Sequence, residues 1–413
     1  MTKHNLETTL FAQAIQRVQF NFKILDLQLD ERNSKKSIWE FVRFRWLFWF
    51  NMALLNFATV GEIAWLVEGV STGKSLIELC YLGPCLTLCI ACNFLCTYFV
   101  KHSRRILELI ASIRTLQSMS AELEETDVKF LKSQVKIFYI AVYTLTATQC
   151  VGITLFGLIP FVTMCLSYYH SGEVELVLPF FVLYPFDTTD IRFWPIAYIQ
   201  EMWGALLACL ILLAPSYLLY ACSTFIIFQF HLLKKDLRNI IPYEDILDKY
   251  VLNEDLKTDF KKIINRHRKL IECVDLLKEA YSESNLLNVV MSSILICFTG
   301  FNVMAIEDLA MAVPFLPFLL MDMLQIFFIC YYGDMIMRYS SSISDAIYEC
   351  QWYRAEAAIV KDLLFLSLRS QKPCKLTALH FSDINFKTFT KILSTSWSYF
   401  ALLKSMYRRA MNR

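Results

Sequence analysis

Long runs of apolar residues alternate along this chain with charged segments. A helix needs about 20 residues to cross a bilayer, whereas the strands of a membrane barrel are about 10 residues long and alternate in polarity. The length of the runs therefore predicts helices. We expect seven spans, at residues 46–68, 76–100, 136–168, 198–230, 285–305, 309–333 and 388–407. This pattern predicts an all-α, polytopic seven-transmembrane fold in which residues 1–413 form one domain.

The charged segments between the spans also carry apolar residues at helical spacing. Within 255–283 the stripe consists of Phe260, Ile264, Ile271, Val274 and Tyr281. Residues 335–369 likewise predict a helix. We therefore expect segments 231–284 and 334–387 to form a helical anchor beside the membrane.

An N-terminal stripe leaves two interpretations open. It runs through Phe11, Ile15, Val18, Phe22 and Leu25. Such an amphipathic helix can lie flat on the inner leaflet of the membrane. It can equally be a surface helix that packs on its own chain.

The composition fits this picture and narrows the class of function. Hydrophobic residues make up 56% of the chain and charged residues 19%, against about 25% charged in soluble proteins. A net charge of +2 gives no global electrostatic reason to bind nucleic acid. The sequence contains no P-loop, no G-x-S-x-G and no H-E-x-x-H motif. We therefore expect no enzyme activity and no cofactor.

The distribution of Lys and Arg predicts the orientation, because cytoplasmic loops are enriched in both residues. Of the 40 such residues, 33 lie in four connecting pieces and only two in the other three. The rich pieces are 1–45, 101–136, 231–284 and 334–387, and the poor pieces are 69–75, 169–197 and 306–308. The N-terminus is therefore predicted to be cytoplasmic. Seven spans then place the C-terminus outside, although the tail is basic. An even number of spans would remove this conflict. Residues 334–387, however, are too charged to hold another crossing.

Four cysteines form a stripe on the second predicted span: Cys85, Cys89, Cys92 and Cys96. Four ligands on one straight helix cannot close a tetrahedral site, so we expect no metal there. Small residues that allow close helix packing in lipid are the favoured interpretation.

Three acidic residues lie within the predicted spans. Asp322 sits in the middle of a span, where a carboxylate is costly and should face protein or water; a functional role and a hydrogen-bonded packing role both remain open. Glu62 and Glu78 are expected near the outer membrane surface, where a solvated carboxylate costs little.

The outer halves of the spans combine aromatic residues with a few polar groups, which is what a pocket for a small apolar ligand requires. The candidate ligand-binding residues are Tyr81, Gln149, Gly152, Phe156, Trp203, Leu206, Phe315 and Phe318.

Four stretches of the sequence carry a resemblance to a known family. They are "CYYGDMI" (Cys330–Ile336), "SDAIYECQWY" (Ser344–Tyr353), "KLTALHFSDINFKTFTKILSTSWSYFALLKSMY" (Lys375–Tyr407) and, in the second outer loop, "LPFFVLYPFD" (Leu178–Asp187). They resemble insect odorant receptors, and the final segment is most similar to those of moths and butterflies. The obligate co-receptor of that family is longer in its fourth cytoplasmic region, so this chain resembles a ligand-tuning subunit.

The resemblance implies a function and a location. It implies a non-selective cation channel gated by a small volatile ligand and assembled with the co-receptor as a heterotetramer. That channel would lie in the plasma membrane of olfactory sensory neurons, with a ligand pocket in the outer half of spans two to six. The ligand itself, pheromone or plant volatile, stays open.

The resemblance also assigns a pore to the last span. Ser394, Thr395, Ser396 and Ser398 make this helix rich in hydroxyls, as a wettable pore helix requires. Aligned by "SYF", Leu402 falls at the hydrophobic constriction of the co-receptor and Ser405 at a polar pore position. Met406 shares their helix face.

Two other classes of protein remain as alternatives. A seven-span G-protein-coupled receptor would have the opposite orientation, and its usual Asp/Glu-Arg-Tyr and Asn-Pro-x-x-Tyr motifs are missing. A secondary transporter would more often show repeated halves with broken helices, and no repeat is visible.

The orientation is directly testable. We expect an epitope tag placed before Thr2 to be reached by antibody only after the cells are permeabilised, because the N-terminal piece is rich in Lys and Arg. Staining of intact cells would contradict the orientation and the channel interpretation that depends on it.

Overall fold

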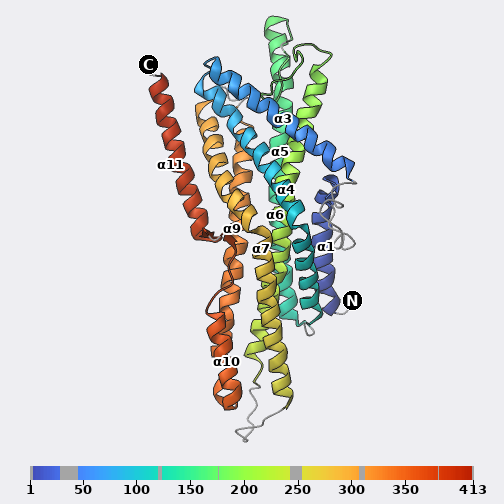
Figure 1. Ribbon diagram of the computed structural model, residues 1–413, viewed down its shortest axis with the longest axis vertical. Helices are drawn as coiled ribbons and strands as arrows, with labels where there is room; N and C mark the ends of the chain where they lie inside the picture. Colours follow the sequence, from blue (N-terminus) through green and yellow to red (C-terminus); the bar gives the residue numbers. More distant parts are fainter. Residues whose placement is uncertain are drawn as a thin grey trace.

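The computed structural model describes residues 3–27, 45–119, 123–174, 176–241, 254–306, 312–379 and 381–411. Long helices dominate them, which confirms the all-α prediction (Figure 1). Those long enough and apolar enough to cross a membrane are α3 (Trp46–Ser71), α4 (Leu76–Ser118), α5 (Glu125–Ser171), α6 (Trp194–Arg238), α7 (Glu254–Ala305) and α9 (Phe315–Glu349). They correspond to the first six predicted spans. The predicted outer loop 306–308 lies almost entirely outside the described residues.

Four of these helices are about twice as long as the roughly 20 residues that cross a bilayer. Helix α7 has 52 residues, so it is about 78 Å long at 1.5 Å per residue. The predicted fifth span and the predicted anchor helix at 255–283 are thus parts of one helix. Helices α4, α5 and α6 extend in the same direction, and the anchor is a continuation of the transmembrane bundle.

Helix α6 is the central column of the bundle. In its most apolar stretch 83% of the residues are buried, against 28% in α5. Helices α1, α3, α4, α5, α7 and α9 all pack against it. The other spans therefore take their positions from α6.

Helix α1 (Lys3–Ile24) decides between the two interpretations of the N-terminal stripe. The five residues of the stripe, the last of which directly follows the helix, are all at most 4% exposed, and the helix packs mainly on α6. The Phe11 ring meets Phe225 edge-on at 4.8 Å, and Phe22 stacks on Phe99 at 4.5 Å. The helix therefore packs on its own chain and does not lie flat on the inner leaflet.

A buried polar chain fixes the predicted inner end of this contact. Gln229 donates a hydrogen bond to Glu7 (2.7 Å) and accepts one from Arg266 (2.8 Å), whose guanidinium also pairs with Asp236 at 2.7 Å. Burial raises the pKa of Glu7 to about 7, against the opposing effect of the Gln229 hydrogen bond. These contacts join α1, α6 and α7.

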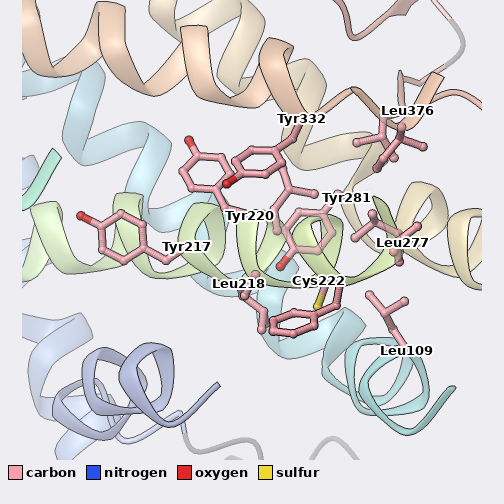
Figure 2. Close-up of a cluster of buried hydrophobic side chains, with 14 of the residues drawn as sticks. Leu109, Tyr217, Leu218, Tyr220, Cys222, Leu277, Tyr281, Tyr332 and Leu376 are labelled. Carbon is pink, nitrogen blue, oxygen red and sulfur yellow. The ribbon is translucent and has the colours of Figure 1, made fainter. Parts of the chain in front are cut away.

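Buried tyrosine, leucine and cysteine side chains from several helices form one hydrophobic cluster (Figure 2). Tyr220 of α6 stacks on Tyr332 of α9 with ring centres 5.1 Å apart. Each buried hydroxyl finds a partner: Tyr220 donates to the Gln325 carbonyl and Tyr281 to the Pro215 carbonyl, both at 3.1 Å. Buried tyrosines of this kind combine apolar area with a satisfied polar end, so they hold α6, α7 and α9 in fixed register.

The segment after α9 differs from the sequence prediction. Residues 335–369 were predicted as one helix, but α9 ends at Glu349, and α10 (Ala357–Ser370) follows after a short 3₁₀ turn, η2 (Trp352–Arg354). Cys350 and Glu356 both have extended backbone at the two ends of this turn, which breaks the helix. The apolar positions continue across the break, which explains why periodicity alone did not reveal it.

A small hairpin then leads into α11 (Phe386–Met411). Strand β1 (Thr377–Ala378) pairs antiparallel with β2 (Ser382–Asp383). The hairpin is held on its neighbours, since the Leu379 N–H donates to Ser282 Oγ of α7 at 3.0 Å. Helix α11 packs mainly on α7 and α9 and stands at the edge of the bundle (Figure 1).

Helix α11 has the length to cross a membrane but a more polar composition than the six other candidates. Three hydroxyl groups of its serine- and threonine-rich part are satisfied within the helix: Thr395, Ser396 and Ser398 each donate to the carbonyl four residues earlier, at 2.8–3.0 Å. The hydroxyl-rich sequence therefore forms a regular helix with one side packed and the other exposed.

The junction before α11 depends on a glycine. A Cβ atom at Gly333 of α9 would overlap the carbonyl oxygen of Ile384, just after β2. We predict that Gly333→Ala destabilises the protein by about 1–3 kcal/mol, because backbone must move to make room. Thermal unfolding of the detergent-solubilised protein measures this change. The control is Gly300→Ala in α7, where the nearest atom to a new Cβ is Phe400 at 3.8 Å; equal melting temperatures for the two variants would contradict the close approach.

Candidate functional site

One apolar cavity of about 80 Å³ lies in the predicted outer half of the bundle. Helices α3, α4, α5, α6 and α9 surround it, together with the loop between α5 and α6. Most of its wall is carbon: Leu55, Leu88, Ile153, Phe156, Phe180, Val182, Phe315, Phe318 and Met321.

Small residues on two facing helices leave this space empty. Gly204, Ala205 and Ala208 of α6 line the cavity, and Gly152 of α5 lies across from them. A Cβ atom added at Gly204 would meet nothing within 4 Å, and one at Gly152 would meet only Pro317 at 3.9 Å. These glycines border open space and are not required for close packing of helices.

Aromatic rings form a linked set at one end of the cavity. Phe156 packs against Phe180 (5.3 Å) and meets Phe315 edge-on (5.4 Å). Tyr81 lies one ring further out and contacts Phe315 and Phe181, at 5.0 Å and 4.9 Å. Offset and edge-on contacts of this kind stabilise each ring's position, so the wall is well defined.

The loop between α5 and α6 closes the predicted outer end. Helix α5 ends at Gly172, whose φ of 71° is the left-handed conformation that favours glycine. Further on, Phe180 and Val182 reach into the cavity wall, and the Leu183 N–H donates to the Gly61 carbonyl at 3.1 Å. A Cβ at Gly61 would overlap Val182, so only glycine lets the loop approach α3 this closely.

Glu201 of α6 holds the same loop from below. Its Oε2 accepts a hydrogen bond from the Phe180 N–H (3.1 Å), and its Oε1 lies 3.2 Å from the Tyr184 hydroxyl, which also faces Gln200 Oε1 at 2.5 Å. Both carboxyl oxygens thus contact the loop, and Glu201 fixes Phe180 in the cavity wall.

The structure brings together five of the eight predicted ligand-binding residues. Gln149, Gly152, Phe156, Phe315 and Phe318 all line the cavity, and Tyr81 contacts its wall through Phe315. Trp203 and Leu206 lie apart from this group. They are 38% and 36% exposed and lie outside the lining, because the face of α6 that meets the cavity carries Gly204, Ala205 and Ala208. The Trp203 indole N–H instead donates to Asn51 of α3 at 3.3 Å.

Glu62 requires a correction. It was expected to be solvated near the membrane surface, but it is only 4% exposed and lines the cavity. Leu55, Ala58 and Glu62 follow the i, i+3, i+7 spacing of one helix face, and all three reach the cavity. That spacing is the sequence signal that could have placed Glu62. Glu78 is exposed at the start of α4, where its carboxylate accepts a hydrogen bond from Ser75 at 3.0 Å.

Asp322 faces protein, as its position in a span required. It is 2% exposed, and Ser292 of α7 donates a hydrogen bond to its Oδ1 at 3.1 Å. One turn further along α9, Gln325 donates to Ser216 of α6 at 3.3 Å. Asp322 therefore belongs to a buried polar layer between α6, α7 and α9, directly beside the cavity residue Met321.

Two cysteines of the α4 stripe line the cavity, and the other two are buried between helices. Cys85 and Cys89 line the cavity, whereas Cys92 donates a hydrogen bond to the Ala208 carbonyl of α6 at 3.2 Å and Cys96 is buried. Their close contact with neighbouring helices is what small side chains allow.

The predicted pore residues lie on the free side of α11. Leu402 and Met406 are 59% and 50% exposed, and Ser405 is exposed beside them. Leu403 lies on the opposite side, in an apolar cluster with Phe298 and Phe301 of α7. Lys404 shares a shallow groove with Arg408 and Arg409 further along the helix.

Comparison with known proteins identifies the family. The family model described as "7tm Odorant receptor" matches residues 76–397, most of the chain. The chain belongs to the odorant receptor family. This membership argues against the G-protein-coupled receptor and transporter alternatives.

Individual relatives agree in length and fold. Odorant receptor 85c of Drosophila melanogaster is 26% identical, with 92% of this chain and 94% of the relative covered. Odorant receptor 67c of the same species is 25% identical over 85% of this chain and 86% of the relative. The insect olfactory receptor OR5 from Machilis hrabei, solved in complex with eugenol, has the same fold at 15% identity, with a TM-score of 0.77 over 96% of this chain and 99% of that one. A second structure of OR5 from Machilis hrabei gives a TM-score of 0.74 over 95% of this chain and 97% of that one.

Proposed function

We propose that the cavity between α3, α4, α5, α6 and α9 is the odorant-binding site of this receptor. The observation that carries the proposal is a mostly apolar cavity with an ordered aromatic wall, bordered on α5 and α6 by glycine and alanine, which leave its space open. Burial of apolar ligand surface supplies the binding free energy in such a site. Its small volume favours a volatile molecule with few heavy atoms.

We further propose that the receptor is the ligand-tuning subunit of a cation channel in the plasma membrane of olfactory neurons, assembled with the co-receptor. Helix α11 would line the pore with Leu402, Ser405 and Met406. Their exposure on the free side of α11 supports this role, since a pore helix presents one face to water and packs the other. The remaining pore wall would come from the other subunits.

Contacts along the chain offer a route from the cavity to the pore helix. Phe318 and Met321 of α9 line the cavity, the next residue, Asp322, is bonded to Ser292 of α7, and α7 packs against α11. A ligand that displaces α9 would act on α11 through this connection. This would be the functional role of Asp322.

The pocket is tested by comparing two aromatic residues. We predict that Phe156→Ala weakens the response to agonists, with a loss of about 1–3 kcal/mol in binding free energy, because one wall of the cavity is removed. The measurement is the dose–response curve of the current in cells that also express the co-receptor. Trp203→Ala is the matched control, because Trp203 lies outside the cavity lining. A shift in Trp203→Ala with none in Phe156→Ala, at equal surface expression, would place the ligand elsewhere.

The pore face is tested by cysteine accessibility. We expect Leu402→Cys or Ser405→Cys to make the agonist-evoked current sensitive to external thiol reagents, because both positions would face water in the open pore. Block should be partial, since co-receptor subunits supply part of the same ring. Leu403→Cys should be insensitive because its side chain packs on α7. Block at Leu403 alone would mean that the opposite face of α11 lines the pore.

A further inference from the structure

One carboxyl group in the cavity wall is not used by the protein's own contacts. Glu62 is 4% exposed and lies among the lining residues. Its Oε1 receives only the weak thiol donor of Cys89, at 3.9 Å, and its Oε2 has no hydrogen-bond partner among the described residues.

Glu201 shows what a satisfied carboxyl looks like in the same wall. Both of its oxygens contact the closing loop: one accepts a hydrogen bond from a backbone N–H, and the other lies beside the Tyr184 hydroxyl. The two acidic side chains therefore differ in role: Glu201 holds the loop in place, and Glu62 is left open toward the cavity.

An open carboxyl oxygen in an apolar cavity is costly, because a buried polar atom without a partner loses its hydration and gains nothing in return. The lining residues include no Lys, Arg or His that could supply a charged donor. The Thr148 hydroxyl is engaged as well, since it donates to carbonyls of its own helix at 2.9 Å and 3.0 Å. A donor brought by the ligand would satisfy Glu62.

We propose that Glu62 is the polar anchor of the odorant site, and that the site selects small apolar molecules that end in a hydroxyl group. This inference rests on the cavity being the odorant site, as proposed above. A hydroxyl fits either protonation state of Glu62, since it can donate to a carboxylate and can exchange hydrogen bonds with a carboxylic acid. An ether or ester cannot donate, and an ammonium group carries a charge whose desolvation in this apolar wall is costly.

The test compares head groups on a constant carbon skeleton. The receptor is expressed with the co-receptor and exposed to 1-hexanol through 1-dodecanol, geraniol and 2-phenylethanol. Each alcohol is paired with its methyl ether, its acetate, its primary amine and the parent hydrocarbon. We expect agonists among the alcohols, each more potent than its methyl ether by about tenfold or more, the ratio that one hydrogen bond to a carboxyl group provides.

Two substitutions connect this preference to Glu62. In Glu62→Met, which keeps the length of the side chain and removes both oxygens, the potency ratio between alcohol and ether should fall to about one. In Glu62→Gln, which keeps an acceptor, the alcohol should remain the better ligand. Glu68→Met is the matched control on the same helix, because Glu68 is exposed and should leave the ratio unchanged.

The outcomes separate this inference from the proposed site. Two results in the unmodified receptor would overturn the role of Glu62 without any mutant. One is equal potency of alcohols and their ethers, and the other is a set of agonists confined to ethers, esters, amines and hydrocarbons. An equal loss of alcohol and ether potency in Glu62→Met at normal surface expression would reduce Glu62 to a structural role. Failure of the cavity itself would appear differently, as agonist responses that Phe156→Ala leaves unchanged.

Discussion

Burial of α6 is the constraint on which the rest of the structure depends. In lipid there is little hydrophobic force between helices, so helices associate through close packing and a few polar contacts. Helix α6 meets this requirement on nearly all sides and supports six other helices. Where it carries Tyr217, Tyr220, Phe225 and Phe228, the bundle is solid. Where it carries Gly204, Ala205 and Ala208, its neighbours do not close the gap, and the cavity remains.

This arrangement separates a densely packed half of the receptor from a half that contains the cavity. The predicted inner half holds the stacked tyrosines, the packed helix α1 and the polar chain from Glu7 to Asp236. The predicted outer half holds the cavity, closed by a loop that rests on Glu201 and Gly61. Interiors packed at high density transmit small displacements well. In the proposed mechanism, a ligand in the cavity would act on α9 and α7, the two long helices against which α11 mainly packs.

The hydrophobic pattern was sufficient to locate the helices but not to show where each helix continues or ends. Long apolar runs located the spans, and the stripe through Phe260 and Val274 located the inner part of α7, because burial in a helix repeats every three to four residues. The pattern could not show that this stripe continues into the fifth span as one helix, nor that a turn at Cys350 ends α9. Both features depend on contacts between helices that are distant in sequence.

The candidate site shows the same limit at the scale of single residues. Phe156 and Trp203 are both aromatic and both lie in outer half-spans, yet of the two only Phe156 lines the cavity. The face of α6 toward the cavity carries small residues, and Trp203 lies on another face of that helix. Glu62 was assigned to the membrane surface on the assumption that a carboxylate seeks water. Its spacing from Leu55 and Ala58 puts Glu62 on the same face of α3 as these two residues. This spacing identifies Glu62 as a cavity residue only once the face of α3 that meets the cavity is known.

The most direct test of the account is to find where an agonist binds. An aliphatic diazirine analogue of an active odorant would be photoactivated on the receptor assembled with its co-receptor, and the labelled peptides mapped by mass spectrometry. We predict labelling of the segments of α3, α5, α6 and α9 that contain Leu55, Ile153, Ala205 and Phe318, and its suppression by excess unmodified agonist. Suppressible labelling confined to α11, or to lipid-facing residues such as Ile199 of α6, would contradict the cavity as the odorant site.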